Sequence, residues 1–203
     1  MNRKEIKAKA KELVKGKHYW TLVGSYVVDG AIVGVASEVA LLPGLFVSGP
    51  MGVGFANVYK GVLRDDEAHF PKLFSGFKRF WPHAVASLLE YIYVFLWSLL
   101  LVIPGLIKSY AYSMSYYLMA DDENLGGNDA ITKSKELMKG HKWDLFVLHL
   151  SFIGWILLSM LTCGILTVFY VGPYMQMAQL IWYEENIKQK EEPAQEVVAE
   201  QAE

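Results

Sequence analysis

Residues 84–103, AVASLLEYIYVFLWSLLLVI, are 20 consecutive positions at which Glu90 is the only charged side chain. A helix of about 20 apolar residues spans the hydrocarbon core of a bilayer, which is about 30 Å thick. Helices buried inside soluble domains seldom run that far without a polar face. The stretch therefore predicts a transmembrane helix, and with it an all-α, polytopic membrane protein.

Further apolar stretches lie on both sides of this segment. His149 is the only acidic or basic side chain in Leu145–Thr162. The stretch Ile165–Tyr183 contains no acidic or basic side chain. Three weaker stretches complete a prediction of six transmembrane helices: Thr21–Leu42, Leu45–Val58 and Leu106–Ala120.

The composition excludes several classes of protein. With 53% hydrophobic residues, 14% aromatic residues and a mean hydropathy of +0.23, the 203-residue chain is too apolar to be disordered. A net charge of −2 is unlike that of a strongly basic nucleic-acid-binding protein, so we expect no nucleic-acid partner. The single Cys163 rules out an intramolecular disulfide framework and a metal site with several cysteine ligands.

The chain repeats itself with a period of about 61 or 62 residues. Trp20 and Trp81 are 61 residues apart, and KELVKG at residues 11–16 recurs as KELMKG at residues 135–140, two periods later. Such a period indicates repeated structural units that bury their faces against one another. We predict three helical hairpins, near residues 1–67, 68–123 and 124–185, which together form one membrane domain over residues 1–185.

The basic residues indicate which side of the membrane each hairpin end faces. Of the 19 Lys and Arg residues, 18 lie at the ends of the predicted hairpins and only Lys108 lies elsewhere. The positive-inside rule then places both termini and both long loops of a multi-pass cell-membrane protein in the cytoplasm. The opposite turns are short, at Pro43-Gly44, Pro104-Gly105 and Gly164. The first 18 residues lack the apolar region of a signal peptide, so we expect no cleaved signal.

Basic amphipathic segments, each followed by a Trp, precede the first helix of each hairpin. Helical spacing separates apolar residues from lysines, as in helices that lie in the headgroup region, and Trp is typical of the membrane interface. These segments either recognise anionic lipid or serve only to set topology. The predicted interface residues are Lys4, Lys7, Lys11, Lys15, Lys133, Lys135, Lys139, Trp20, Trp81 and Trp143.

Asp29, Glu90 and His149 are ionisable side chains inside predicted helices that lie near equivalent repeat positions. Asp29 and Glu90 each follow their Trp by nine residues, and His149 follows Trp143 by six. Because an unpaired charge at the bilayer centre costs at least about 2.5 to 3.5 kcal/mol, we expect a polar cluster where the first helices of the hairpins meet. The cluster either fixes helix register or serves a proton relay, an ion site or a substrate. Lys108 is a further intramembrane candidate, although its long stem can also carry the amine to the outer interface.

The sequence contains none of the common motifs of enzyme chemistry. It lacks a GxxxxGK[ST] phosphate loop, an HExxH zinc motif, a GxSxG nucleophile elbow and a CxxC pair. We therefore predict no catalytic residues, no metal site and no cofactor. Residues 186–203 are polar and acidic, and we predict that they form a disordered cytoplasmic tail.

Four segments, spread over nearly the whole chain up to Glu185, form a specific set: MNRKEIKAKAKELVKG, FSGFKRFW, LWSLLLVIPGLIKSYAYSMSYYLMADD and SKELMKGHKWDLFVLHLSFIGWILLSMLTCGI. This set resembles the bacterial integral membrane family named domain of unknown function 975, found mainly in Gram-positive bacteria. The resemblance implies a six-helix membrane protein. It implies no established activity, cofactor or catalytic residue.

The leading functional hypothesis is a non-enzymatic accessory or scaffold protein of the bacterial cytoplasmic membrane that acts through lipid and helix contacts. Its expected partners are membrane lipids, including anionic ones, and a membrane-protein partner or a second copy of the chain. The alternative is a small transporter or channel that uses Asp29, Glu90 and His149. A membrane-embedded lipid-modifying enzyme ranks third, because no arrangement of a nucleophile and a base is visible.

Overall fold

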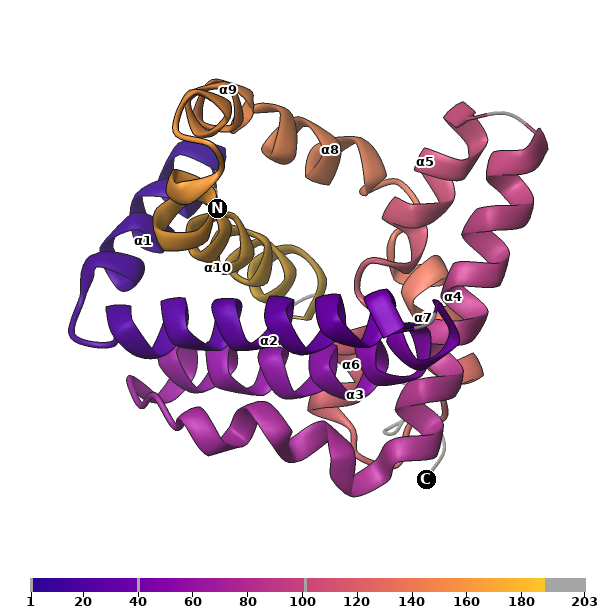
Figure 1. Cartoon of the computed structure of the whole chain (residues 1–203). Helices are drawn as coiled ribbons and strands as arrows, with labels where there is room; N and C mark the ends of the chain where they lie inside the picture. Colours follow the sequence, from indigo (N-terminus) through magenta and orange to yellow (C-terminus); the bar gives the residue numbers. More distant parts are fainter. Residues whose placement is uncertain (1, 40, 101, 189–203) are drawn as a thin grey trace, which may run out of the picture.

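The computed structural model describes residues 2–39, 41–100 and 102–188, and all regular structure within these ranges is helical. This confirms the all-α fold class. The elements are α1 (Arg3–Lys15), α2 (Tyr19–Val39), α3 (Leu41–Lys60), η1 (Gly61–Asp65), η2 (Phe70–Arg79), α4 (Phe80–Leu100), α5 (Val102–Tyr112), α6 (Ser115–Asp121), α7 (Gly127–Leu137), α8 (Lys142–Leu150), α9 (Ile153–Leu161), η3 (Thr167–Val171), α10 (Gly172–Tyr183) and η4 (Glu184–Lys188). Figure 1 shows α2 and α3 side by side, with α4 packed beside α5.

All six predicted apolar stretches fold mainly into helices, some as single helices and some as two successive ones. Two segments, Tyr19–Glu38 and Lys142–Leu161, are long and apolar enough to cross a membrane by length and composition. A membrane-like character is therefore supported at these two segments. The six-span arrangement stays a prediction.

The expected turns at the two Pro-Gly pairs are wrong in position. Pro43 lies near the start of α3 and Pro104 near the start of α5, so helix has already begun at each pair. Proline is tolerated there because the first helical N–H groups have no partner within the helix. The third turn is where the sequence places it, with Cys163 and Gly164 at φ +49° and +82°.

The start and the buried face of α1 are both explained by its local sequence. Asn2 caps its first turn, and Glu5 completes a capping box with the Asn2 backbone N–H. Ile6, Ala10 and Val14 fall on one helical face, and all three are buried. This apolar face packs on α10, so the segment joins the core of the protein as well as presenting lysines to the outside.

The segment η2 is a ten-residue 3-10 helix, in which side chains three residues apart lie above one another. Lys72, Ser75 and Lys78 therefore share one face of η2. A second face begins with Leu73 and Gly76, which are buried, and a third carries Phe74 and Phe77, which are 45% and 37% exposed. Polar, small and aromatic side chains thus repeat every three residues here. In an α-helix of 3.6 residues per turn, the members of each row would point in different directions.

Two glycines allow η2 to lie directly on α3. A Cβ at Gly54 of α3 would overlap the backbone carbonyl of Leu73, and a Cβ at Gly76 of η2 would overlap the carbonyl of Pro50. Backbone therefore meets backbone along this contact, and no side chain separates the two elements.

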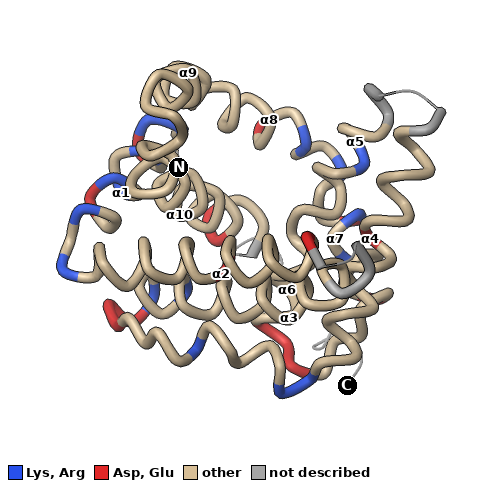
Figure 2. Tube along the Cα trace, viewed as in Figure 1, with Lys and Arg blue, Asp and Glu red and all other residues tan. Residues whose placement is uncertain are grey.

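The three basic segments each pack on a helix that belongs to another predicted hairpin. Contacts join α1 to α10, η2 to α3, and α7 to both α4 and α6. Figure 2 shows α2 and α4 largely without Lys or Arg, whereas these residues gather in α1, η2 and the region of α7. Charge is therefore separated from the long apolar helices in space as well as in sequence.

The outer surface of the long helices is apolar. Phe95 of α4 is 54% exposed and Leu161 of α9 is 81% exposed. The three repeat-related tryptophans, Trp20, Trp81 and Trp143, are 73%, 69% and 70% exposed. Large exposed apolar patches of this kind mark a membrane or protein interaction surface.

Regular structure runs past the boundary expected at residue 185. The π-helix η4 continues to Lys188, and Ile187 within it is buried. The rest of the predicted tail, residues 189–203, lies outside the described residues.

We predict that Gly54→Ala destabilises the protein by about 1 to 3 kcal/mol, because the new Cβ has to displace η2 from α3. The measurement is thermal unfolding of the protein in detergent. Gly30→Ala is the matched control, since no atom lies within 4 Å of a Cβ there, and alanine favours helix. Equal melting temperatures for the two variants would contradict the contact.

Candidate functional site

A buried ion pair joins the ends of the first two predicted hairpins. Lys60, the last residue of α3, is only 4% exposed, and its ammonium nitrogen lies 2.9 Å from Asp121 Oδ2. The same amine donates a hydrogen bond of 2.6 Å to the backbone carbonyl of Tyr117. Asp121 also accepts a hydrogen bond of 2.9 Å from the Tyr183 hydroxyl of α10. Helix ends from all three predicted hairpins therefore meet at one carboxylate.

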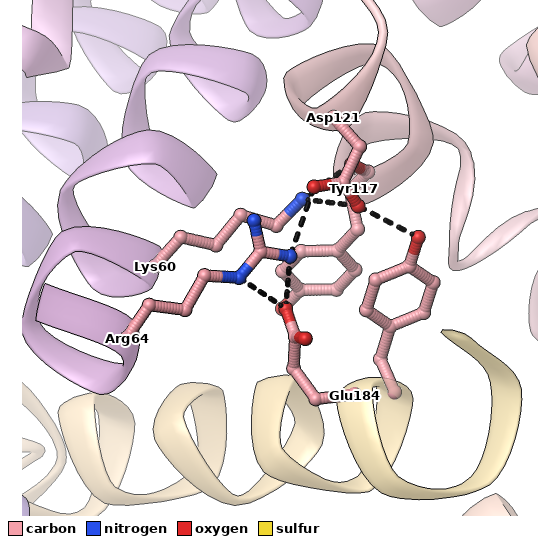
Figure 3. A network of polar contacts seen from close by, with 6 residues as sticks. Lys60, Arg64, Tyr117, Asp121 and Glu184 are labelled. Carbon is pink, nitrogen blue, oxygen red and sulfur yellow. Dashed lines mark hydrogen bonds and ion pairs between the residues drawn. The ribbon is translucent and has the colours of Figure 1, made fainter. Parts of the chain in front are cut away.

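Arg64 adds a second cation to this network (Figure 3). Its guanidinium donates through Nη2 to Asp121 Oδ1 at 2.9 Å and through Nε to Glu184 Oε1 at 2.9 Å. Arg64 belongs to the π-helical turn η1 after α3, and Glu184 to the similar turn η4 after α10. Two cations thus face two carboxylates, which makes the network close to neutral.

Aromatic rings surround the buried amine of Lys60. The nitrogen lies 5.8 Å from the ring centre of Tyr117 and 5.4 Å from that of Tyr183, and these two rings stack at 5.4 Å. Rings at this distance attract a cation through their electron-rich faces. Because the amine is almost fully buried, its attraction to Asp121 is stronger than that of an exposed pair.

The pKa values of the pair follow from burial and from its partners. Burial lowers the pKa of Lys60 to about 8, against the opposing effect of Asp121. Burial would raise the pKa of Asp121, but Lys60 and Arg64 outweigh it and hold that pKa at about 2. Both groups are therefore charged at neutral pH.

A separate polar cavity of about 300 Å³ lies among the predicted spans. Asp29 of α2 lines it, together with Tyr116 of α6 and Gln176 and Gln179 of α10. Its walls thus combine one carboxyl group with neutral hydrogen-bonding groups. In the described residues, no group of three or more His, Cys, Asp and Glu side chains is arranged to hold a metal ion.

The other predicted cluster residues flank this cavity without contacting one another directly. Glu90 accepts a hydrogen bond of 3.3 Å from Ser115 and interacts with Tyr116, which lines the cavity. His149 lies 3.2 Å from the Tyr110 hydroxyl and interacts with Gln179, which also lines the cavity. The three groups of the predicted polar cluster are thus connected through neutral side chains, Tyr116 and Gln179.

Lys108 does not join this arrangement. Its amine lies 4.3 Å from the ring centre of Trp97 on the neighbouring helix α4. The contact is a cation–π interaction between two partly exposed side chains.

The predicted interface lysines divide into two groups. Most of them are exposed: Lys4, Lys11 and Lys15 on α1, Lys135 on α7 and Lys139 just after it. Lys7 instead donates to the Ser151 carbonyl at 3.0 Å and lies 4.4 Å from the Phe152 ring centre, so it ties α1 to the break between α8 and α9. Lys133 is half-buried and has a partner of its own.

The ion-pair network was missed at the sequence level, although a signal for it exists. Lys60 and Asp121 are 61 residues apart, and Asp121 and Tyr183 are 62 apart. These are the two spacings of the predicted repeat, and the three residues occupy equivalent positions as the last residues of α3, α6 and α10. Comparing charges of opposite sign at that spacing would have paired Lys60 with Asp121.

The structure defines an all-helical protein with two apolar segments long enough to cross a membrane and with a buried ionic junction at the ends of α3, α6 and α10. Residues 99–191 match the family model described as a protein of unknown function (DUF975). This match confirms, over those residues, the resemblance that the sequence motifs indicate. No curated protein and no solved structure matches the chain.

We predict that Asp121→Asn destabilises the protein by about 3 to 5 kcal/mol, because it leaves the buried Lys60 without its charged partner. The measurement is chemical or thermal unfolding in detergent. Asp66→Asn is the matched control: its partner Lys17 is 63% exposed, and an exposed pair contributes little. A stability loss in the control as large as that in Asp121→Asn would refute the special role of the buried pair.

The same pair predicts a pH dependence. Asp121 has a pKa of about 2 in the folded protein against an ordinary value of 3.8, so its stabilisation is complete above about pH 4 and is lost as the pH falls through 2. The stability difference between the wild type and Asp121→Asn should therefore shrink between pH 4 and pH 2. A difference that stays constant over this range would contradict the assignment.

Proposed function

We propose that this chain is a non-enzymatic, multi-pass protein of the bacterial cytoplasmic membrane that serves as a scaffold or accessory factor. It holds three helical hairpins together and presents their basic segments to lipid headgroups and to neighbouring membrane proteins. The single observation that carries the proposal is the exposure of Trp20, Trp81 and Trp143, each about 70% exposed at equivalent repeat positions. Three exposed tryptophans at equivalent repeat positions fit a protein seated in a bilayer, where tryptophan is typical of the interface.

The packing order of the basic segments supports three equivalent units. With units at residues 1–67, 68–123 and 124–185, η2 of the second unit packs on α3 of the first, and α7 of the third packs on α6 of the second. The segment α1 of the first unit packs on α10 of the third, which closes the cycle. A closed cycle leaves no unit with an unpaired end, and this favours a compact six-span body over a loose chain of hairpins.

The location of the charges supports cytoplasmic termini. Along the sequence, the basic segments and the residues of the ion-pair network flank the predicted spans at the ends of the hairpins, while the turn at Cys163 and Gly164 separates the two predicted spans of the third hairpin. The positive-inside rule assigns the basic end to the cytoplasm.

The proposed topology predicts a labelling pattern for exposed cysteines. The native Cys163 is exposed and should react with a membrane-impermeant maleimide in intact cells. In a Cys163→Ser background, Lys17→Cys and Lys139→Cys should react only after the membrane is permeabilised. Labelling of either of these positions in intact cells would overturn the orientation.

The proposed lipid contact predicts selective co-purification. Protein extracted from bacterial membranes without full delipidation should carry anionic lipid above its share in the membrane. Replacing the exposed Lys4, Lys11, Lys135 and Lys139 together with Gln should reduce this enrichment at least about twofold, since each lysine contributes about 1 kcal/mol near an anionic surface. The same four positions changed to Arg are the charge-matched control. Recovery of neither enriched anionic lipid nor a stoichiometric protein partner would count against the scaffold.

A second candidate function, a small transporter or channel, is favoured by the polar cavity. Asp29 lines it, and Glu90 and His149 adjoin it through Tyr116 and Gln179. In proteoliposomes loaded with a pH-sensitive dye, Asp29→Asn should reduce proton flux at least about tenfold relative to wild type and to Asp66→Asn, because the carboxyl group is then lost from the path. If a folded Asp29→Asn conducts as the wild type does, the cavity is structural.

A further inference from the structure

The polar face of η2 lines a pocket in the predicted cytoplasmic half of the protein. Lys72, Ser75 and Lys78, which the three-residue period of η2 places in one row, form one wall. Lys60 and Arg64, from the end of α3 and from η1, form another. The pocket encloses about 330 Å³, a volume that suits a small ligand.

A smaller hollow of about 50 Å³ continues this pocket toward the protein interior. The two share Asn57, Ser75, Lys78 and Glu123 among their lining residues, and Arg79 lines the inner hollow. One guanidinium nitrogen of Arg79, Nη1, is buried and has no hydrogen-bond partner in the described part of the chain. A buried charged donor without a partner is costly, so a partner from outside the chain is expected at this position.

The charges around the pocket favour an anionic partner. Lys60 and Arg64 are already paired with Asp121 and Glu184. Among the described residues, Lys72, Lys78 and Arg79 form no ion pair, so three cations are available there against the carboxylates of Asp65 and Glu123. Arginine and lysine donors gathered around one polar hydroxyl are suited to the oxygens of a phosphate group.

We propose that η2, α3 and the connection after α6 form a binding site for a phosphate group, held by Arg79, Lys78 and Lys72. The phospholipid headgroup is the favoured source of the phosphate, because another face of η2 exposes Phe74 and Phe77, and Trp81 in the first turn of α4 is exposed as well. An amphipathic helix with aromatic residues on one face and lysines on the other lies in the headgroup region. In that position the pocket opens where lipid phosphates are found. This choice of source rests on the membrane location in the proposed function.

The test is a titration of the purified protein in mild detergent, followed by native mass spectrometry for bound lipid and by thermal unfolding for bound solute. The probes are phosphatidylglycerol, an uncharged diacylglycerol with the same chains, and inorganic phosphate. The wild type should bind phosphatidylglycerol and not the diacylglycerol. Arg79→Gln and the double variant Lys72→Gln/Lys78→Gln should each weaken this binding about tenfold or more, as expected for loss of charge-assisted hydrogen bonds.

The control variant is Lys9→Gln/Lys17→Gln, which removes the same charge from two exposed lysines, on and just after α1, that already pair with Glu185 and Asp66. It should change the affinity less than about twofold, because it alters only the general field at the surface. The variant at Lys72 and Lys78 keeps the proposal testable if Arg79→Gln fails to fold, since both lysine side chains are exposed and their replacement leaves the core intact.

Each outcome is decisive for the site. If inorganic phosphate stabilises the wild type and this effect is lost in the Arg79 and Lys72/Lys78 variants, the site is confirmed and a free phosphate is its source. If the control variant loses as much affinity as the site variants, or if neither phosphate compound binds, the site is refuted. A protein that labels with the wrong topology yet binds inorganic phosphate in this way would refute the proposed membrane role and leave the phosphate site standing.

Discussion

The contact between Lys60 and Asp121 determines how the rest of the structure is assembled. Burying an ammonium group is costly unless a carboxylate and further donors or acceptors surround it. Here Asp121 of α6 supplies the carboxylate, and Tyr117 supplies the backbone carbonyl. The Tyr183 hydroxyl and the Glu184 carboxylate, at the end of α10, complete the surrounding network. No predicted hairpin can satisfy this amine by itself. The ion pair therefore holds the ends of the helices together, while the exposed surface along the helices is mostly apolar.

The close packing of η2 on α3 complements this junction. Apolar attraction between helices is weak where the surroundings are also apolar, so backbone approach through glycine becomes important for helix association. Gly54 and Gly76 supply it from the two sides of one contact. The same contact orients η2, so that its phenylalanines face outward and its lysines face the pocket. The packing of η2 on α3 and the position of the pocket lysines thus both depend on Gly54 and Gly76.

Much of this arrangement could be predicted from the sequence. The features that were not predicted have identifiable physical reasons. The helical nature of the apolar stretches, the buried face of α1 and the turn at Gly164 follow from local pattern, which depends on nearby residues only. The pairing of Lys60 with Asp121 depends on tertiary contact between segments 61 residues apart, and the pattern of η2 was hidden because its period is three. The Pro-Gly pairs misled because proline is as compatible with a first helical turn as with a loop. Asp29, Glu90 and His149 share a region, but their neutral intermediaries could not be inferred from charge alone.

The contact between α1 and α10 has a consequence for the order of folding. Ile6, Ala10 and Val14 leave the ribosome well before the helix that covers them, which is made some 160 residues later. During that interval their apolar face needs another cover, and an amphipathic helix finds one by lying at the surface of the bilayer. In the proposed topology, its lysines hold it on the side where synthesis takes place. The helix α1 then reaches its final neighbours late, and the proposed ring of hairpins closes only when the end of the third hairpin has been made.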